Sequence, residues 1–151
     1  MLISRTGQYA IQALVFIGLH DPESFINVQD LASNIGVPSA YLAKVMQTLA
    51  HHGLVKSNRG RTGGFALKVA PESINLMQLL LLIEGENFHT ECLLGLKKCS
   101  DETACPMHAK WMPIKTAIIE TLESQTIAYL ADAVREGKYR LSDIPVTPPD
   151  L

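Results

Sequence analysis

The stretch between Asn27 and Leu67 constrains the fold of this chain most, because two short helical segments run directly into a glycine-rich hairpin. The first segment, VQDLASNI, follows Asn27, a residue type that caps helix N-termini, and stops at Gly36. We expect Ser39 to cap the second segment, AYLAKVMQTLAHHG, which Gly53 terminates. Two short helices joined by a turn that contains glycine predict a helix-turn-helix unit.

The residues directly after Gly53 predict a two-stranded wing. LVKS and FALKV have the composition of strands, and NRGRTGG between them has the glycines that a tight turn requires. Arg59 and Arg61 would then project from the tip of the wing. The alternative is an ordinary hairpin with solvated charges, but the preceding helix pair favours a wing.

Two further helices are expected around this unit. Ser4 or Thr6 would cap the first, whose apolar positions follow a helical stripe as far as the Asp21-Pro22 turn. A second, SINLMQLLLLIEG, would start at Ser73 and end at Gly85.

Pro113 is expected to open a long C-terminal helix that runs to about Glu136 and stops at Gly137, because proline is tolerated in the first helical turn. Its apolar residues exceed what one narrow stripe needs: Ile114, Ile118, Leu122, Ile127, Tyr129, Leu130 and Val134. A helix too apolar to lie exposed indicates a dimer interface. The predicted fold class is therefore mainly α, a winged helix-turn-helix with a two-stranded wing, a cysteine loop and a long dimerisation helix.

These elements divide the 151-residue chain into four parts. Residues 1–85 form the DNA-binding domain, residues 86–112 a cysteine-rich loop, residues 113–140 the dimerisation helix and residues 141–151 a flexible, proline-rich tail. No apolar run reaches the roughly 18 residues that cross a bilayer, and the first residues lack the order of a signal peptide. We therefore expect no membrane partner and a cytoplasmic location, where thiols stay reduced.

The charge of the chain is unevenly distributed. Its net charge is −2, which by itself argues against a nucleic-acid partner. Between Leu31 and Pro71, however, there is no acidic residue but five lysines and arginines, and twelve of the fifteen acidic residues lie from Glu72 onward. A basic half joined to an acidic half is the asymmetry expected of a DNA-binding module with a separate sensing or dimerising part.

The predicted DNA contacts lie on the second helix of the helix-turn-helix and on the wing. The N-terminal residues of such a helix face the bases in the major groove, and here they are Ser39, Ala40, Tyr41 and Lys44. The alternative is that Tyr41 belongs partly to the core and that Lys44 is merely solvated. For the wing, Arg59 and Arg61 would enter a narrow minor groove, whose negative potential favours arginine.

All three cysteines lie in one polar loop, in the pattern C-x6-C-x5-C-x2-H formed by Cys92, Cys99, Cys105 and His108. Three thiols and an imidazole suit either zinc or an iron–sulfur cluster. Uneven spacing favours the larger cluster over zinc, but a structural zinc, a metal-free thiol switch and three buried cysteines remain alternatives. A thiol redox enzyme or metal carrier is less favoured, because the chain has no catalytic or cofactor fingerprint; we expect no enzyme.

The chain resembles the IscR/NsrR/CymR family of bacterial transcription regulators, the Rrf-two family. The resemblance covers about Met1 to Arg140 and is carried by ISRTGQYAIQAL, by VPSAYLAKVMQTLAHHGLVKSNRGRTGGFAL and by the three cysteines. Its most specific part runs from Tyr41 to Leu67.

This resemblance implies a homodimer that binds double-stranded operator DNA and senses iron–sulfur, redox or nitric oxide status through a cluster. IscR-like members use a histidine just after the third cysteine as the fourth ligand, and His108 stands in that place. NsrR-like members use an acidic residue near the N-terminus, where this chain has Gln8, a poor anionic ligand. The resemblance thus implies ligation by Cys92, Cys99, Cys105 and His108, and favours a 2Fe–2S over a 4Fe–4S cluster. Ala43 replaces an acidic residue of the IscR recognition helix, which implies a different operator sequence.

Overall fold

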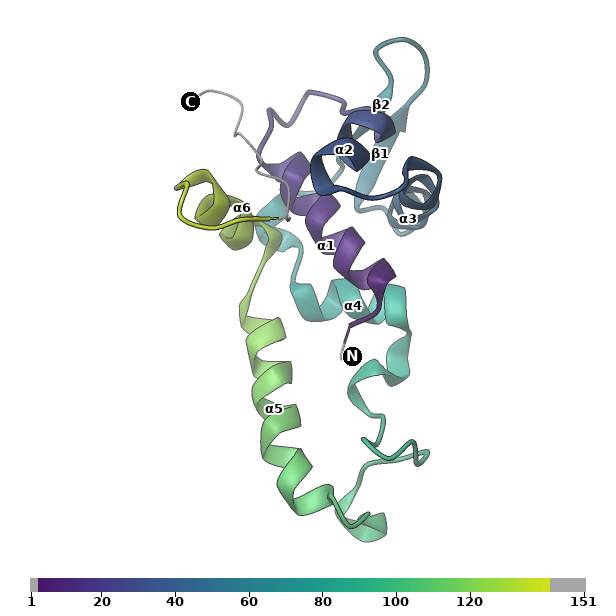
Figure 1. Ribbon diagram of the computed structural model, residues 1–151, viewed down its shortest axis with the longest axis vertical. Helices are drawn as coiled ribbons and strands as arrows, with labels where there is room; N and C mark the ends of the chain where they lie inside the picture. Colours follow the sequence, from purple (N-terminus) through teal and green to yellow (C-terminus); the bar gives the residue numbers. More distant parts are fainter. Residues whose placement is uncertain (1–2, 142–151) are drawn as a thin grey trace.

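A computed structural model describes residues 3–141 as a helical body with a two-stranded sheet at one end and a helical stalk at the other (Figure 1). The body comprises α1 (Arg5–Gly18), α2 (Val28–Ile35), α3 (Ser39–His51), β1 (Val55–Asn58), β2 (Gly64–Leu67), the 3-10 turn η1 (Pro71–Ser73), α4 (Leu76–Glu84) and α6 (Ile127–Arg135). The short turn η2 (Glu86–His89) precedes the cysteines, η3 (Asp101–Thr103) lies between Cys99 and Cys105, and α5 (His108–Ser124) forms the stalk. The architecture confirms the predicted mainly helical winged fold.

The helix-turn-helix forms as its sequence predicts, with one change at the start of α3. Asn27 accepts a hydrogen bond from the Asp30 N–H at the start of α2, and Gly36 ends that helix with φ +73°. Ser39 is not the cap of α3: Pro38 is the last extended residue, and its carbonyl already accepts from the N–H groups of Tyr41 and Leu42. The turn is therefore one residue shorter than predicted, because Pro38 fixes its own φ in a value that leads into a helix.

The wing is an antiparallel pair in which Val55 faces Leu67 and Asn58 faces Gly64. It is also tied to the start of α2, because the Phe65 N–H donates to the Ile26 carbonyl at 2.8 Å and the Ile26 N–H donates back at 2.9 Å. The sheet thus begins beside the helix-turn-helix and leaves five residues, 59–63, to form the free tip. The wing therefore has a fixed base and an exposed tip.

The structure shows which residues cap α1 and α4. Ser4, not Thr6, caps α1 and accepts from the Gly7 N–H. The prediction that α4 begins at Ser73 is wrong: Ser73 ends the turn η1, and Asn75 caps α4 by accepting from the N–H groups of Met77 and Gln78. Asn75 provides a better cap because its backbone is extended there, as an N-cap requires.

The single long helix expected from Pro113 to Glu136 is two helices. α5 begins at His108, five residues before Pro113, and stops at Ser124. Gln125 and Thr126 are extended: the Gln125 carbonyl accepts from the Leu76 N–H, and the Thr126 side chain caps α6. These bonds to the start of α4 break the helix, because a continuous helix could not offer its carbonyls to a neighbouring segment.

The break determines which C-terminal residues belong to the core. Ile127, Ala131 and Val134 of α6 are buried, and α6 packs against α1. The residues predicted to form one dimer interface therefore have different environments. Ile127 and Val134 fill the core of their own chain, whereas Ile114 on α5 is 53% exposed. The core otherwise lies between α1, α2, α3 and α4.

None of the helices described for residues 3–141 combines the length and apolar character needed to cross a bilayer. Of the predicted tail, residues 142–151 lie outside the described residues.

Candidate nucleic-acid interface and cysteine loop

The N-terminal residues of α3 that were predicted to face DNA differ in their accessibility. Ala40 and Lys44 are exposed and Ser39 is half-buried on the outer side of the helix. The opposite side, with Leu42, Val45 and Met46, is buried against the core. Accordingly α3 has one face that is anchored in the domain and one that is free to contact a partner.

Tyr41 is held by α1. Its hydroxyl and the Thr6 hydroxyl lie 2.5 Å apart, and its ring meets the Tyr9 ring edge-on with 5.7 Å between their centroids. The side chain is nevertheless 40% exposed. The phenol therefore connects the recognition helix to α1 while one edge of its ring stays accessible.

Arg59 and Arg61 lie in the turn between β1 and β2, and both are exposed. In Figure 1 the wing and α3 lie on the same side of the molecule, away from α6. This is the arrangement in which a recognition helix and a wing can contact adjacent grooves of one duplex.

The cysteine loop lies between η2 and α5, at the end of the molecule furthest from the wing (Figure 1). Cys92 and Cys105 are buried, with their sulfur atoms 3.6 Å apart and without a disulfide. Cys99 is half-buried, and its sulfur lies 3.4 Å from Nδ1 of His108. The four predicted ligands are thus brought together as two close pairs.

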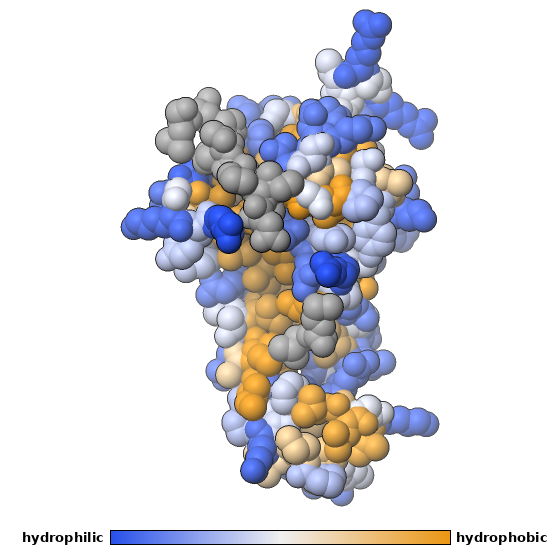
Figure 2. Space-filling model, in the orientation of Figure 1, coloured by the Kyte–Doolittle hydropathy of each residue, from blue (hydrophilic) through white to orange (hydrophobic). Residues whose placement is uncertain are grey.

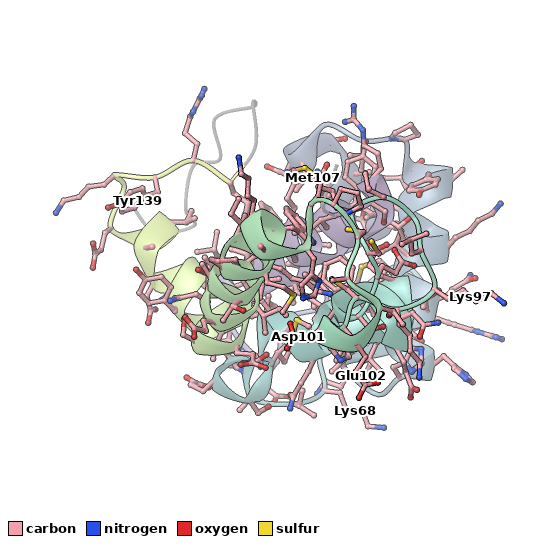
Figure 3. All side chains as sticks on the ribbon, turned by 90° about the horizontal axis from the view of Figure 1, so that it is seen from below. Lys68, Lys97, Asp101, Glu102, Met107 and Tyr139 are labelled. Atoms are coloured by element: carbon pink, nitrogen blue, oxygen red, sulfur yellow. The ribbon has the colours of Figure 1, made fainter. Side chains whose placement is uncertain are left out.

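Asp101 orients the His108 ring. Its carboxylate lies 2.9 Å from Nε2, and the ring itself is buried, with 7% of its surface exposed. A carboxylate at that distance accepts a hydrogen bond from the Nε2–H group. The Nδ1 lone pair of the ring then faces Cys99. In Figure 3 Lys97 projects outward into solvent, whereas Asp101 lies nearer the middle of the view.

The environment of Cys92 favours its thiolate. The backbone N–H of Leu94, helped by that of Leu96, lowers the pKa of the Cys92 thiol below its ordinary value, and burial only partly opposes this. Cys105 and Lys115 add smaller effects in the same direction. Since the thiolate is the form that binds metals, this cysteine is prepared for ligation.

No three side chains of His, Cys, Asp or Glu within residues 3–141 form one group that could hold a single metal ion. The distances within the pairs Cys92–Cys105 and Cys99–His108 can be compared with those between ligands of one ion. With bonds of about 2.3 Å to sulfur and 2.0 Å to nitrogen, two ligands of one tetrahedral ion lie about 3.8 Å apart for two sulfurs and about 3.5 Å for sulfur and nitrogen. The observed 3.6 and 3.4 Å lie within about 0.2 Å of these values, so each pair could bind one ion with little rearrangement of its side chains.

Two ring nitrogens beside the loop lack partners. Nδ1 of His89 and Nε1 of Trp111 are buried without a hydrogen bond, and both side chains line a cavity of about 570 Å³ whose wall includes Cys92. A buried N–H without an acceptor is costly, and sulfide or thiolate sulfur is an acceptor that a cluster would bring. The donor set and its unpaired neighbours therefore fit an iron–sulfur cluster.

One face of α5 remains uncovered by its own chain. Six residues line an open, almost wholly apolar depression of about 510 Å³: Pro113, Ile114, Ala117, Ile118, Thr121 and Leu122. Figure 2 shows a band of hydrophobic residues over the part of the molecule that α5 occupies in Figure 1. These residues are neighbours on one side of α5, so the face is a continuous apolar surface and not a set of isolated side chains.

Sequence reasoning missed two residues that contact the predicted ligands. Neither was predicted: the carboxylate of Asp101 lies 2.9 Å from Nε2 of His108, and the sulfur of Met112 lies 3.7 Å from that of Cys99. Met112 could have been found from its spacing of four residues after His108, which places both on one helix face. The expectation that the helix begins at Pro113 hid that relation.

Comparison with known proteins agrees with this architecture. A relative from Aquifex aeolicus (strain VF5), described as an HTH-type transcriptional regulator, is 33% identical over 144 residues. The match covers 94% of this chain and 99% of the relative. The HTH-type transcriptional regulator IscR of Erwinia tasmaniensis is 27% identical over 87% of this chain and 79% of its own. Among solved structures, T. potens IscR has a TM-score of 0.71 at 27% identity, with 91% of each chain covered.

A second solved structure, that of CymR, the global cysteine regulator of B. subtilis, has a TM-score of 0.72 at 26% identity and covers 87% of this chain and 96% of its own. These relatives are transcriptional regulators and not enzymes, which agrees with the predicted absence of catalysis. The profile of the Rrf2 family, described as iron-dependent transcriptional regulators, matches residues 3–133. The winged fold, the relatives and this match together show that the chain belongs to the Rrf2 family of DNA-binding transcriptional regulators.

Proposed function

We propose that this regulator is a homodimer that holds a 2Fe–2S cluster at Cys92, Cys99, Cys105 and His108 and changes its affinity for operator DNA with the state of that cluster. The observation that carries the proposal is the division of the four side chains into two pairs, 3.6 and 3.4 Å apart. In a 2Fe–2S cluster each iron takes two protein ligands, and these can be of different kinds on the two irons. A single structural zinc would instead draw all four side chains to one point.

The chain's own residues prepare the site in three ways. Backbone N–H groups stabilise the Cys92 thiolate, Asp101 directs Nδ1 of His108 toward Cys99, and Trp111 offers a free N–H at the cavity wall. When bound, the cluster supplies a centre whose charge or integrity changes with the redox or nitric oxide status of its surroundings. The protein supplies orientation, and exclusion of water by the buried cysteines.

A chain of contacts connects the cysteine loop with the recognition helix. Glu84, the last residue of α4 before the loop, accepts hydrogen bonds from the N–H and the hydroxyl of Ser4, at 3.0 and 2.5 Å. Two residues further along α1, Thr6 contacts the Tyr41 hydroxyl on α3. Ordering of the loop would therefore be transmitted to α3 through the first turn of α1, and the proposal requires these contacts to have two arrangements.

The experiment that tests cluster sensing compares wild-type protein with Cys92→Ser, both purified without oxygen. We expect wild-type protein to absorb between about 320 and 460 nm, as charge transfer from sulfur to iron does, and Cys92→Ser to lose this absorption. We also expect wild-type protein and Cys92→Ser to differ at least tenfold in affinity for the same operator fragments, measured by footprinting.

Lys97→Ala is the matched control, because Lys97 is an exposed residue of the same loop and should leave the absorption unchanged. Colourless wild-type protein that contains zinc would refute the cluster in favour of a structural metal. Equal DNA affinity of the loaded and cluster-free forms would refute the coupling.

Dimerisation is proposed through the uncovered face of α5, since a second copy of that face is an apolar surface of matching size. Ile114→Glu places a charge in the middle of this face and is expected to weaken the dimer by about two orders of magnitude, because the two-fold axis introduces the charge twice. Analytical ultracentrifugation measures the change. Glu123→Lys, a charge change at an exposed position on the opposite side of α5, should leave the dimer intact, and an unchanged Ile114→Glu dimer would place the interface elsewhere.

A further inference from the structure

Cys99 contacts two other soft ligand atoms. Its sulfur lies 3.4 Å from Nδ1 of His108 and 3.7 Å from Sδ of Met112. His108 and Met112 stand four residues apart in the first turns of α5, so both side chains leave the same face of the helix. One thiol, one imidazole and one thioether therefore converge from the loop and the helix that follows it.

The distances allow Cys99 to share one ion with either neighbour. With metal bonds of about 2.3 Å to sulfur and 2.0 Å to nitrogen, two sulfur ligands of one ion lie about 3.8 Å apart and a sulfur and a nitrogen ligand about 3.5 Å apart. The two contacts of Cys99 lie within about 0.1 Å of these separations, so an ion could bind there with little rearrangement of the side chains. Asp101 accepts a hydrogen bond from Nε2 of His108 and so keeps the Nδ1 lone pair directed at the same point, as the carboxylate partners of metal-binding histidines do.

The kind of donor selects the kind of ion. A neutral thioether is a poor ligand for zinc, magnesium or calcium, whereas the combination of thiolate, thioether and imidazole suits Cu(I). None of the three ligand atoms is an oxygen. The nearby carboxylate of Asp101 contacts Nε2 of His108, on the far side of the ring from Nδ1. Cys99 and Met112 also line a cavity of about 470 Å³, which gives an ion access from solvent.

We propose that Cys99, His108 and Met112 form a binding site for a cuprous ion. Binding forms a copper–sulfur bond as the Cys99 thiol loses its proton to solvent, and copper enters and remains as Cu(I), so no electron is transferred. The copper thiolate is neutral, so the three lysines that line the cavity, Lys97, Lys98 and Lys115, do not repel it.

The site shares Cys99 and His108 with the proposed cluster site but does not depend on it. A cuprous ion and the cluster would exclude one another, because each needs the same thiolate and the same imidazole. Met112 belongs to the copper site alone, whereas Cys92 and Cys105 belong to the cluster site and form a second thiol pair that the copper test has to remove. These residues therefore allow the two proposals to be tested separately.

The test uses the full-length Cys92→Ser protein, in which the other close thiol pair, itself able to bind Cu(I), has been removed. Cu(I) is titrated without oxygen in competition with bicinchoninate, and circular dichroism verifies that each variant is folded. We expect one Cu(I) per chain, and we expect the additional change Met112→Leu, which preserves size and apolar character, to weaken binding at least tenfold. X-ray absorption at the copper edge should count two sulfur neighbours with Met112 and one without it.

Met112→Leu in the otherwise wild-type chain is expected to retain the cluster absorption of the wild type. Equal Cu(I) affinity with and without Met112, or a copper spectrum with only one sulfur in both proteins, would overturn the copper site. Loss of the cluster absorption in Met112→Leu would overturn the assignment of Met112 to the copper site alone. If Cu(I) binds as expected but wild-type protein carries no iron, the cluster proposal fails and the copper site stands.

Discussion

Replacement of both Arg59 and Arg61 by alanine is expected to weaken operator binding by about two orders of magnitude at low salt. Both side chains are exposed at the free tip of the wing, whose base is held by the bonds between Phe65 and Ile26, so the arginines are presented by a fixed support. The proposed dimer would lose four positive charges, so the slope of log affinity against log salt should fall by about 3 to 4. Fluorescence anisotropy over a range of salt concentrations measures both quantities.

The matched control is the pair Lys138→Ala and Arg140→Ala, which removes the same charge from exposed positions after α6, on the other side of the molecule from the wing. This variant should change affinity severalfold at most, since only long-range attraction is lost. If the two double variants bind DNA equally well, the wing does not enter the groove and acts only through net charge.

Gly64→Ala is expected to destabilise the protein by about 3 kcal/mol, which corresponds to a fall of roughly 6 to 12 °C in Tm for a chain of this size. Gly64 has φ +153°, and a Cβ atom there would overlap the Ile26 carbonyl and lie 2.7 Å from the Asn27 nitrogen. These are backbone atoms at the start of α2, so neither can move without breaking the bonds that hold the wing. Thermal unfolding followed by circular dichroism measures the loss.

Gly60→Ala is the control for this prediction. Gly60 also has a positive φ, +107°, but no atom lies within 4 Å of a Cβ placed there. It should therefore lose only the cost of backbone strain, about 1 kcal/mol. Similar losses for the two variants would mean that the contact with Ile26 does not restrain the wing.

The two proposed metal sites make different demands on the same loop. The cluster requires the pairs Cys92–Cys105 and Cys99–His108 to act together, whereas Cu(I) requires only the second pair and Met112. Occupation by copper would leave Cys92 and Cys105 without their partners in the cluster. A regulator arranged in this way would lose its cluster in the presence of Cu(I), and its operators would then be bound as by the cluster-free form.

Much of the winged domain could be predicted from the sequence, because its signals are local. Asn27 and Gly36 bound α2 as predicted, and Gly53 and Gly85 follow α3 and α4 as their positive φ angles allow. The turn NRGRTGG produced the wing at the expected place. Each of these outcomes depends on the conformational preferences of residues within one or two turns of chain.

The predictions that failed concern bonds between distant segments. Pro113 was expected to start a helix, but α5 begins at His108, where the chain leaves the cysteine loop. The break at Gln125 and Thr126 depends on bonds with Ile74, Asn75 and Leu76, about fifty residues earlier. Periodicity cannot reveal such a break, because Ile127 and Val134 are apolar whether they face a partner subunit or the core of their own chain.

By itself the sequence determined the winged helix-turn-helix and the supply of soft ligands, because caps, glycines and cysteines act through their own chemistry. Only the tertiary structure decided how those ligands are grouped. It divided four predicted ligands into two pairs, brought Asp101 to His108 and set Met112 beside Cys99. The physical reason is that metal chemistry depends on distances of a few tenths of an ångström between side chains, and those distances follow from how the loop packs on α5.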